Sequence, residues 1–131
     1  MNAPSEDVAD ILAASSAVAL TVGTDLFVNY MPTTPDACVA VYDTGGEAPE
    51  PGFTYERPTF QVRVRGDKGD NRPAHEQAQA CRDELNGTAN STVNAARYIG
   101  IWCMSDVMFV AYDDNNRPIF TVNFRAHRTD A

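Results

Sequence analysis

The sequence predicts an α+β fold in which a single antiparallel or mixed β-sheet of about 4–5 strands carries two helices packed on one face. Two segments repeat apolar residues at helical spacing, and several short segments alternate apolar and polar residues as strands do. Runs of turn residues separate these segments. The length of 131 residues fits one compact domain. We therefore expect residues 1–131 to form a single domain.

A first helix is expected near the N-terminus. Ser5 can cap this helix, and Glu6 and Asp7 would then lie in its first turn, close to the positive end of the helix dipole. Val8 and Leu12 recur at helical spacing. These two residues are expected on the face that packs against the sheet.

Two apolar segments follow the first helix. Leu26–Met31 is extended in character, and Ala37–Tyr42 is typical of a buried strand. Pro32 and Pro35 separate the two segments.

Strict alternation makes Pro58–Gly66 the most informative strand of the chain. Its apolar positions are Phe60, Val62 and Val64, and its polar positions are Gln61, Arg63 and Arg65. Arginine is favoured for binding carboxylates across an interface, so the polar face is a candidate partner surface, together with Arg125 of the last strand. A solvated outer face explains the same alternation.

The segment 43–57 is rich in turn residues and in acidic charge, a composition that cannot pack a core. Between two strands it predicts a long protruding loop, and long loops in small domains are either functional or disordered. Its candidate docking residues are Asp43, Thr44, Gly45, Gly46, Glu47, Glu50, Tyr55 and Arg57. A surface excursion without a function is the alternative.

A second helix is expected to start near Asn71, with Pro73 in its first turn, and to end at Gly87. The following segment, Thr88–Ala96, is expected to be a polar loop. Three further strands with hairpin connections complete the prediction. These strands are Tyr98–Cys103, Val107–Tyr112 and Ile119–Arg125.

Composition argues against several classes of function. The formal net charge of −8 is unfavourable for binding nucleic acid, which requires clustered Lys and Arg. Cys38, Cys81 and Cys103 are widely spaced and are expected as small buried residues in a reducing compartment. The sequence shows neither a signal peptide nor a membrane-spanning run, so we expect a soluble cytoplasmic product.

We find no constellation of residues that predicts catalysis. His75 and His127 are the only histidines, and no Ser or Cys has the setting of a nucleophile. The run 113–116 lacks the glycine and the glutamate of a calcium loop and is typical of a hairpin turn. Gly45 and Gly46 are not followed by the lysine of a phosphate-binding loop. We expect no enzyme, cofactor or metal site.

Several short motifs follow one another in a specific order over about residues 5 to 126. They are Gly23-Thr-Asp-Leu-Phe27, Met31-Pro32, Pro35-Asp36, Val39-Ala-Val-Tyr-Asp-Thr-Gly-Gly46, Pro58-Thr-Phe-Gln-Val-Arg-Val-Arg-Gly66, Leu85-Asn-Gly87, an Asp-Asp-Asn-x-Arg turn and a strand ending Asn123-Phe-Arg125. In this order they resemble the minor capsid or tail terminator family of tailed bacteriophages. The proline-rich, acidic segment 43–57 departs from the family pattern.

This resemblance implies a structural virion protein rather than an enzyme. The family forms a six-membered ring on the last ring of the major tail tube protein, ends tube growth and offers a docking face to the head–tail connector (stopper) protein. DNA would pass through the ring without specific binding, and no membrane would be involved. The resemblance thus implies assembly in the host bacterial cytoplasm and a final place in the tail or neck of the virion.

Within such a ring we expect Gln61, Arg63 and Arg65 to belong to a subunit or tube interface, and the segment 43–57 to become ordered on docking. A head-completion or connector adaptor of the phage neck is the main alternative, because it would share the size, acidity and ring-forming habit. A small cytosolic enzyme or ligand-binding domain is a third alternative, which would need a pocket lined by His75 or His127.

Overall fold

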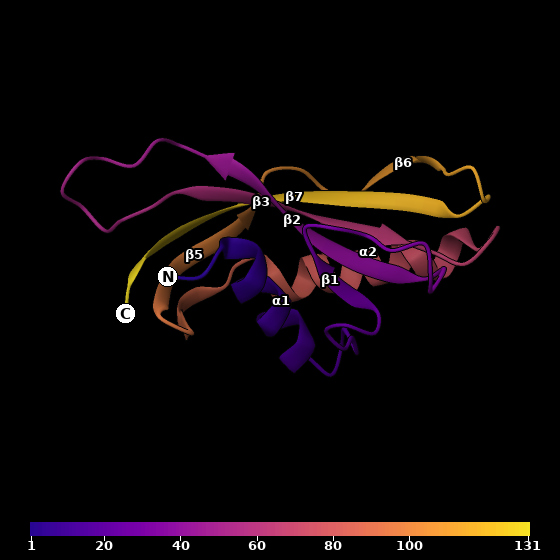
Figure 1. Cartoon of the computed structure of the whole chain (residues 1–131), viewed down its shortest axis with the longest axis horizontal. Helices are drawn as coiled ribbons and strands as arrows, with labels where there is room; N and C mark the ends of the chain where they lie inside the picture. Colours follow the sequence, from indigo (N-terminus) through magenta and orange to yellow (C-terminus); the bar gives the residue numbers. More distant parts are fainter.

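The computed structural model describes all residues from Met1 to Ala131. Its two helices are α1 (Pro4–Ala14) and α2 (Asn71–Leu85). The strands are β1 (Leu26–Val28), β2 (Cys38–Gly46), β3 (Pro58–Arg65), β4 (Ala89–Val93), β5 (Ala96–Cys103), β6 (Met108–Tyr112) and β7 (Pro118–Asp130). All strands belong to one sheet of order β1-β2-β3-β7-β5-β4, with β6 also beside β7 (Figure 1).

The sheet is mixed, because β1 runs parallel to β2 while the other neighbours are antiparallel. Strand β7 is the longest and lies beside β3 along one side. On its other side, β5 pairs with residues 124–130 and β6 pairs with residues 118–121. β5 and β6 therefore follow one another along the same edge of β7.

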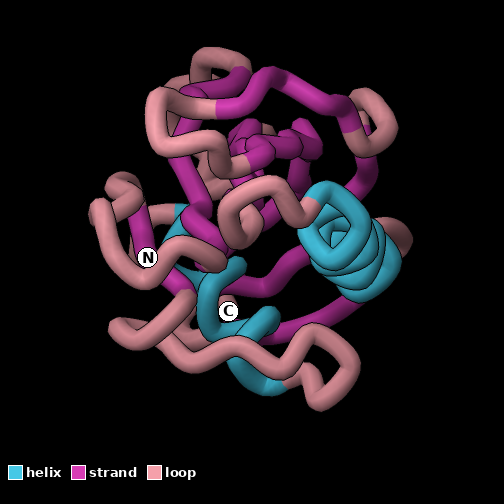
Figure 2. Tube along the Cα trace, turned by 90° about the vertical axis from the view of Figure 1, so that its right-hand side faces the viewer, coloured by secondary structure: helices cyan, strands magenta, loops and turns pink.

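The hydrophobic core lies between one face of this sheet and both helices. Phe60 of β3 stacks on Phe124 of β7 with 5.1 Å between ring centroids. Leu12 of α1 and Leu85 of α2 are buried in the same cluster, where each fully buried apolar side chain contributes about 1.5–3 kcal/mol. Figure 2 shows α2 end-on beside the curled strands. The expected α+β class with helices on one face is confirmed.

The strand count is higher than expected, because the sheet has 7 strands rather than about 4–5. Strand β4 lies where a polar loop was expected, within 88–96. Its residues are Ala-Asn-Ser-Thr-Val, so it lacks the apolar alternation of a strand that covers a core. Backbone pairing with β5 holds it in place instead. The three-residue strand β1 is also too short to be identified from its pattern alone.

Two expected boundaries also change. Strand β2 continues to Gly46, so the first residues of the expected loop 43–57 are paired with β3. Ser5 does not cap α1, since the N-cap residue is Ala3 and Ser5 is buried inside the first turn. The cap comes from outside the helix, because Asp43 of β2 accepts hydrogen bonds from the Ser5 backbone N–H at 3.0 Å and from its hydroxyl at 2.6 Å.

The cysteines fit the expected role only in part. Cys38 and Cys81 are buried, whereas Cys103 is half-buried, and all three are free thiols. Burial raises the pKa of the Cys81 thiol to about 12, so this thiol is inert at neutral pH. Neither helix is both long and apolar enough to cross a membrane.

Candidate functional site

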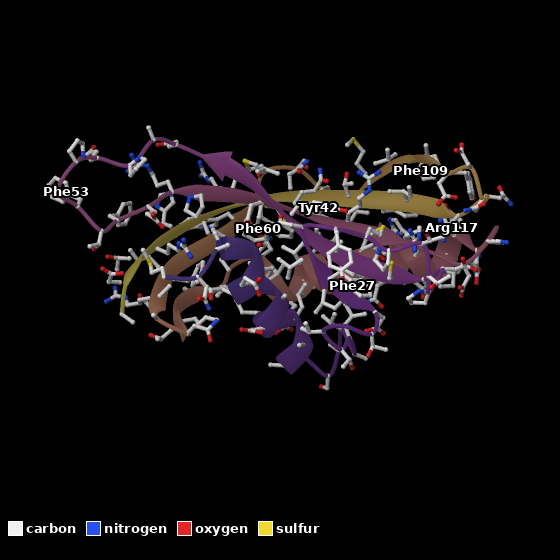
Figure 3. The ribbon with its side chains drawn as sticks, viewed as in Figure 1. Phe27, Tyr42, Phe53, Phe60, Phe109 and Arg117 are labelled. Carbon is white, nitrogen blue, oxygen red and sulfur yellow. The ribbon has the colours of Figure 1, made fainter.

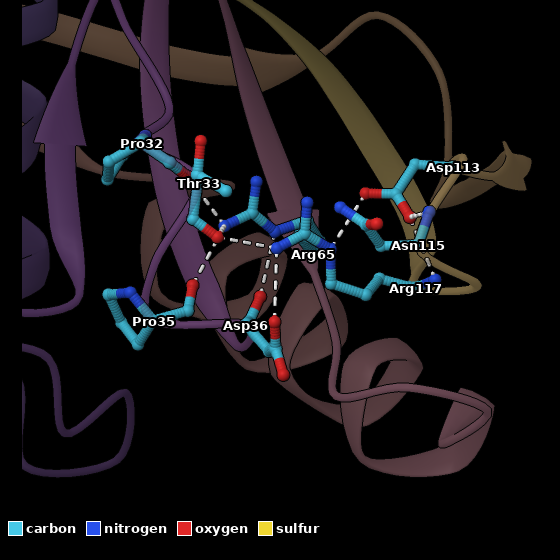
Figure 4. Close-up of polar contacts among 8 residues, drawn as sticks. All are labelled: Pro32, Thr33, Pro35, Asp36, Arg65, Asp113, Asn115 and Arg117. Carbon is cyan, nitrogen blue, oxygen red and sulfur yellow. Dashed lines mark hydrogen bonds and ion pairs between the residues drawn. The ribbon is translucent and has the colours of Figure 1, made fainter.

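Arg65, expected on a partner surface, lies inside the subunit with only 6% of its surface exposed. Its guanidinium donates hydrogen bonds to the backbone oxygens of Asp36 at 2.8 Å, Pro32 at 2.6 Å and Pro35 at 2.8 Å (Figure 4). A guanidinium has five donors in a fixed fork, which suits a curved run of carbonyl groups. Arg65 therefore fixes the loop 31–36 over one end of the outer sheet face.

Arg117 is a second buried arginine at the same loop. Its Nη1 donates to the Thr33 backbone oxygen at 2.6 Å and to Asp36 Oδ1 at 3.1 Å, and its Nε donates to Asp113 Oδ2 at 2.8 Å. Desolvation would raise the pKa of Asp113, but hydrogen bonds from the Arg117 backbone N–H and guanidinium hold that pKa below its usual value. The loop is thus fastened to both β3 and the turn before β7.

The two arginines bring together residues that were noted separately in the sequence. Met31-Pro32, Pro35-Asp36, the strand ending in Arg65 and the Asp-Asp-Asn-x-Arg turn all meet at this loop. Arg117 is the arginine of the Asp-Asp-Asn-x-Arg motif, but no structural role was predicted for it, because it belongs to no periodic pattern. The motif itself was the available signal.

The other polar residues expected at an interface remain accessible on the outer sheet face. Gln61 is half-buried and donates to Asn123 Oδ1 at 3.1 Å. Arg63 is half-buried and takes part in none of the ion pairs of the structure. Arg125 is exposed, with its guanidinium carbon 5.7 Å from the centroid of the Trp102 ring. The expected arginine surface is therefore divided, with Arg65 inside and Arg63 outside.

The segment 47–57 between β2 and β3, which we call the arm, projects from one end of the molecule (Figure 1). Its return half follows β7. Glu56 and Arg128 exchange backbone hydrogen bonds at 2.8 and 3.0 Å, and the hydroxyls of Thr54 and Thr129 lie 2.9 Å apart. Tyr55 bonds His127 Nδ1 through its hydroxyl. This half of the arm is thus held to the sheet within a single subunit.

The base of the arm is closed by contacts between its two sides. The Arg57 guanidinium donates to Glu47 Oε2 at 2.6 Å, and the hydroxyl of Thr44 donates to that of Thr59 at 2.7 Å. Gly46 has a φ of +122°, and a side chain there would collide with the backbone at Arg57 and Pro58. Together with Asp43, which caps α1, these residues support the base of the arm.

A buried polar cluster links the arm to both ends of the chain. The Tyr98 hydroxyl donates to Asp7 Oδ2 at 2.7 Å, and Arg128 Nη1 lies 3.3 Å from the same oxygen. Arg128 also donates through Nε to Glu56 Oε1 at 2.9 Å. Burial, followed by the hydrogen bond to Asp7, raises the pKa of the Tyr98 phenol. Sequence analysis assigned Asp7 to the helix dipole and did not find this cluster.

The tip of the arm carries an exposed aromatic residue. Phe53 is 68% exposed and lies at the far end of the molecule (Figure 3). Its backbone N–H bonds the Glu50 backbone oxygen at 3.3 Å, so the two residues share one turn. Glu50 takes part in none of the ion pairs of the structure, whereas Glu47 and Glu56 pair with Arg57 and Arg128.

Strand β6 forms a second exposed apolar surface. It was expected as a strand, but all five of its residues are exposed, and it has a neighbour on one side only, which is β7. We call this surface the β6 edge; its large apolar side chains are Met108, Phe109, Val110 and Tyr112. Met108 lies opposite Thr121 on the outer face, whereas Phe109 lies opposite Phe120 and packs against its ring on the inner face. Isolated exposed apolar residues are ordinary, but an apolar strip along an unpaired strand edge is typical of an interaction site.

The two histidines do not line a common pocket. His75 contacts Phe120, with 5.4 Å between ring centroids, whereas His127 packs against Trp102 and Tyr55. Burial, followed by the charges of Arg125 and Arg57, lowers the pKa of His127. No group of three or more His, Cys, Asp or Glu side chains is placed to hold a metal ion.

A domain whose projecting arm is held at its base and whose apolar edge strand is exposed is typical of subunits that assemble with other proteins. Residues 15–130 match the family described as bacteriophage tail terminator protein. The chain belongs to this family and is a structural component of the virion tail.

Comparison with solved structures adds support for the fold. A chain of the virion of a native gene transfer agent particle is 22% identical, with a TM-score of 0.76, and the match covers 98% of this chain and 96% of that chain. A second solved chain, of which no function is stated, is 13% identical with a TM-score of 0.54 over 95% of this chain and 90% of that chain. No curated protein sequence matches.

Proposed function

We propose that residues 1–131 act as one terminator domain, six copies of which form a ring at the head-proximal end of the tail tube. The ring ends tube growth and joins the tail to the head–tail connector (stopper) protein. The match to the tail terminator family over residues 15–130 supports this role. The likeness to a chain of a gene transfer agent virion is consistent with it.

The observation that carries the ring proposal is the presence of two different exposed apolar surfaces at opposite ends of the molecule. Phe53 marks one end and Phe109 of the β6 edge marks the other (Figure 3). A closed ring needs two unlike surfaces on each subunit, one for each neighbour. Surfaces at opposite ends suit such a head-to-tail arrangement.

The charge of the subunit suits a channel for DNA. A net charge of −8 gives little attraction for phosphates, so DNA would pass through the ring without specific binding. We further propose that the protein acts without catalysis, cofactor or metal, as expected of a purely structural ring.

The direct test mixes the purified protein with tail tubes of its own phage and counts capped ends by electron microscopy. Six-fold density on one tube end is the expected result. Attachment to heads or portals without attachment to tubes would contradict the proposal and would instead support a connector adaptor.

Arg63→Glu combined with Arg125→Glu should reduce capping while the monomer stays folded, because both side chains are accessible. Lys68→Glu, also accessible, is the control.

We restrict the proposed ordering on docking to residues 48–53, because Glu47 is already held by Arg57 and the return half of the arm by β7. Limited proteolysis should therefore cut the free subunit within 48–53, and assembly on tubes should protect this segment. Equal cleavage of free and assembled protein would contradict this.

A further inference from the structure

We propose that the tip of the arm docks on the β6 edge of the next copy of this chain, with Phe53 on the apolar strip and Glu50 facing Arg63. This inference rests on the proposed ring, since it assigns the contact that joins one subunit to the next. Four properties of the subunit support it.

The first property is the placement of the two surfaces. The arm tip and the β6 edge lie at opposite ends of the longest axis of the molecule (Figures 1 and 3). The return half of the arm is fastened to β7 through Glu56 and Thr54, so the tip cannot fold back to its own β6 edge. A second copy supplies the missing surface in a head-to-tail contact.

The second property is the lack of protection on β6. Natural sheets protect their edge strands with charges, prolines or short length. Strand β1 has 3 residues and β4 is polar, so both of these edges are protected. Strand β6 reads Met-Phe-Val-Ala-Tyr, and its large apolar side chains are 45–52% exposed. It carries neither charge nor proline, and its only protection is the register shift between Phe109 and Ala111. Its apolar side chains therefore remain available to a neighbouring subunit.

The third property is the position of Arg63 next to this strip. Arg63 of β3 lies opposite Thr121 of β7, and Thr121 lies opposite Met108 of β6. Directly opposite residues of antiparallel strands point to the same face. The unpaired guanidinium therefore shares the outer face with Met108, which is 52% exposed.

The fourth property is charge complementarity. Of the acidic side chains in the arm, Glu47 and Glu56 are neutralised by Arg57 and Arg128, which leaves Glu50 beside Phe53. An arm tip with one aromatic ring and one carboxylate matches a strip with one guanidinium at its side. Pro49 and Pro51 flank Glu50 and restrict the backbone on either side of it, which lowers the entropy that the tip loses when it becomes ordered on docking.

Cysteine cross-linking on tail tubes tests this contact. The full-length Phe53→Cys, Met108→Cys double variant should form a ladder of linked subunits up to the complete ring after mild oxidation. Phe53→Cys combined with Thr92→Cys, an exposed position on β4, is the matched control and should remain unlinked. Each single cysteine variant controls for the natural thiols, of which only Cys103 is partly accessible.

The outcomes separate this inference from the ring proposal. If rings cap the tubes and the Met108 pair gives no ladder, or only as much as the Thr92 control, the inference is wrong and the ring stands. If the wild-type protein forms no rings on tubes, the ring proposal itself fails.

A charge exchange provides an independent test. Glu50→Arg and Arg63→Glu should each raise the concentration needed to cap half of the tube ends by about tenfold, because each places like charges together. The double variant with both substitutions should restore capping to near the wild-type level. A double variant no better than the single variants would overturn the Glu50–Arg63 pairing, provided that circular dichroism shows all variants folded.

Discussion

Arg63 and Arg65 lie two positions apart on β3 and point to the same sheet face, yet their surroundings are opposite. Arg65 is enclosed by the carbonyl groups of the loop 31–36, whereas Arg63 remains accessible and without an ion pair. Alternation in the strand determines which face a side chain occupies, but it does not determine what covers that face. In this chain a loop between β1 and β2 covers one end of the outer face and leaves the centre open.

The largest expected effect comes from removing the enclosed arginine. Arg65→Ala should lower the free energy of unfolding by about 2–4 kcal/mol, because several buried carbonyl groups lose a charged donor. Arg63→Ala should change it by less than about 0.5 kcal/mol, since the side chain is a surface group without partners. Urea unfolding followed by circular dichroism measures both. Equal losses in the two variants would contradict the assignment of distinct roles.

A milder substitution tests whether the fork of donors matters. Arg65→Lys keeps the positive charge but offers a single ammonium group in place of a planar guanidinium. We expect a loss of about 1–2 kcal/mol in the free energy of unfolding. At the open position, Arg63→Lys should behave as the wild type in the same urea titration. An unchanged free energy of unfolding in Arg65→Lys would show that the positive charge alone holds the loop.

The turn beside the loop should make stability depend on acid. The pKa of Asp113 is lowered in the folded state, so its contribution is present above the unfolded pKa of about 3.9 and is lost as pH falls through the folded value. Asp113→Asn should therefore cost about 1 kcal/mol at pH 7 and progressively less in acid. Urea unfolding from pH 7 to pH 3 measures the difference in the free energy of unfolding between the wild type and Asp113→Asn. Asp114→Asn is the control, and a difference that does not change with pH would count against the prediction.

The smallest expected effect comes from a buried residue of the outer face, Thr121, which lies opposite Arg63. The Thr121 hydroxyl is buried and has no hydrogen-bond partner. Thr121→Val should leave the free energy of unfolding unchanged or raise it by up to about 1 kcal/mol, because an unsatisfied polar atom is removed. A clear destabilisation in urea would reveal a role for this hydroxyl that the contacts do not explain.

Local patterns predicted the helices and the central strands well. Phe60, Val62 and Val64 are buried as the alternation of β3 indicated. Helix α2 starts at Asn71 with Asp70 as its N-cap, one or two residues before the cap expected at Asn71 or Arg72. Strand β4 was missed because its polar side chains carry no alternation, and its position depends on backbone pairing with β5. Backbone pairing of a polar edge strand leaves no signal in a single sequence.

The candidate site was predictable only in outline. The arm was located from its composition, but the role of Asp43 as the cap of α1 depends on a contact between residues far apart in the sequence. The burial of Arg65 depends on Pro32 and Pro35 in the same way. The β6 edge was recognised as a strand, but only the topology shows that one side of this strand is free.

The ion pair between Arg128 and Glu56 links the position of the arm to the folding of other parts of the chain. Glu56 belongs to the arm, Arg128 to β7, and Arg128 also contacts Asp7 of α1. The side chain of Arg128 therefore connects the arm to the first helix, in addition to the backbone contacts that join the arm to β7. Unfolding of the first helix would remove one partner of Arg128 and would weaken the support of the arm.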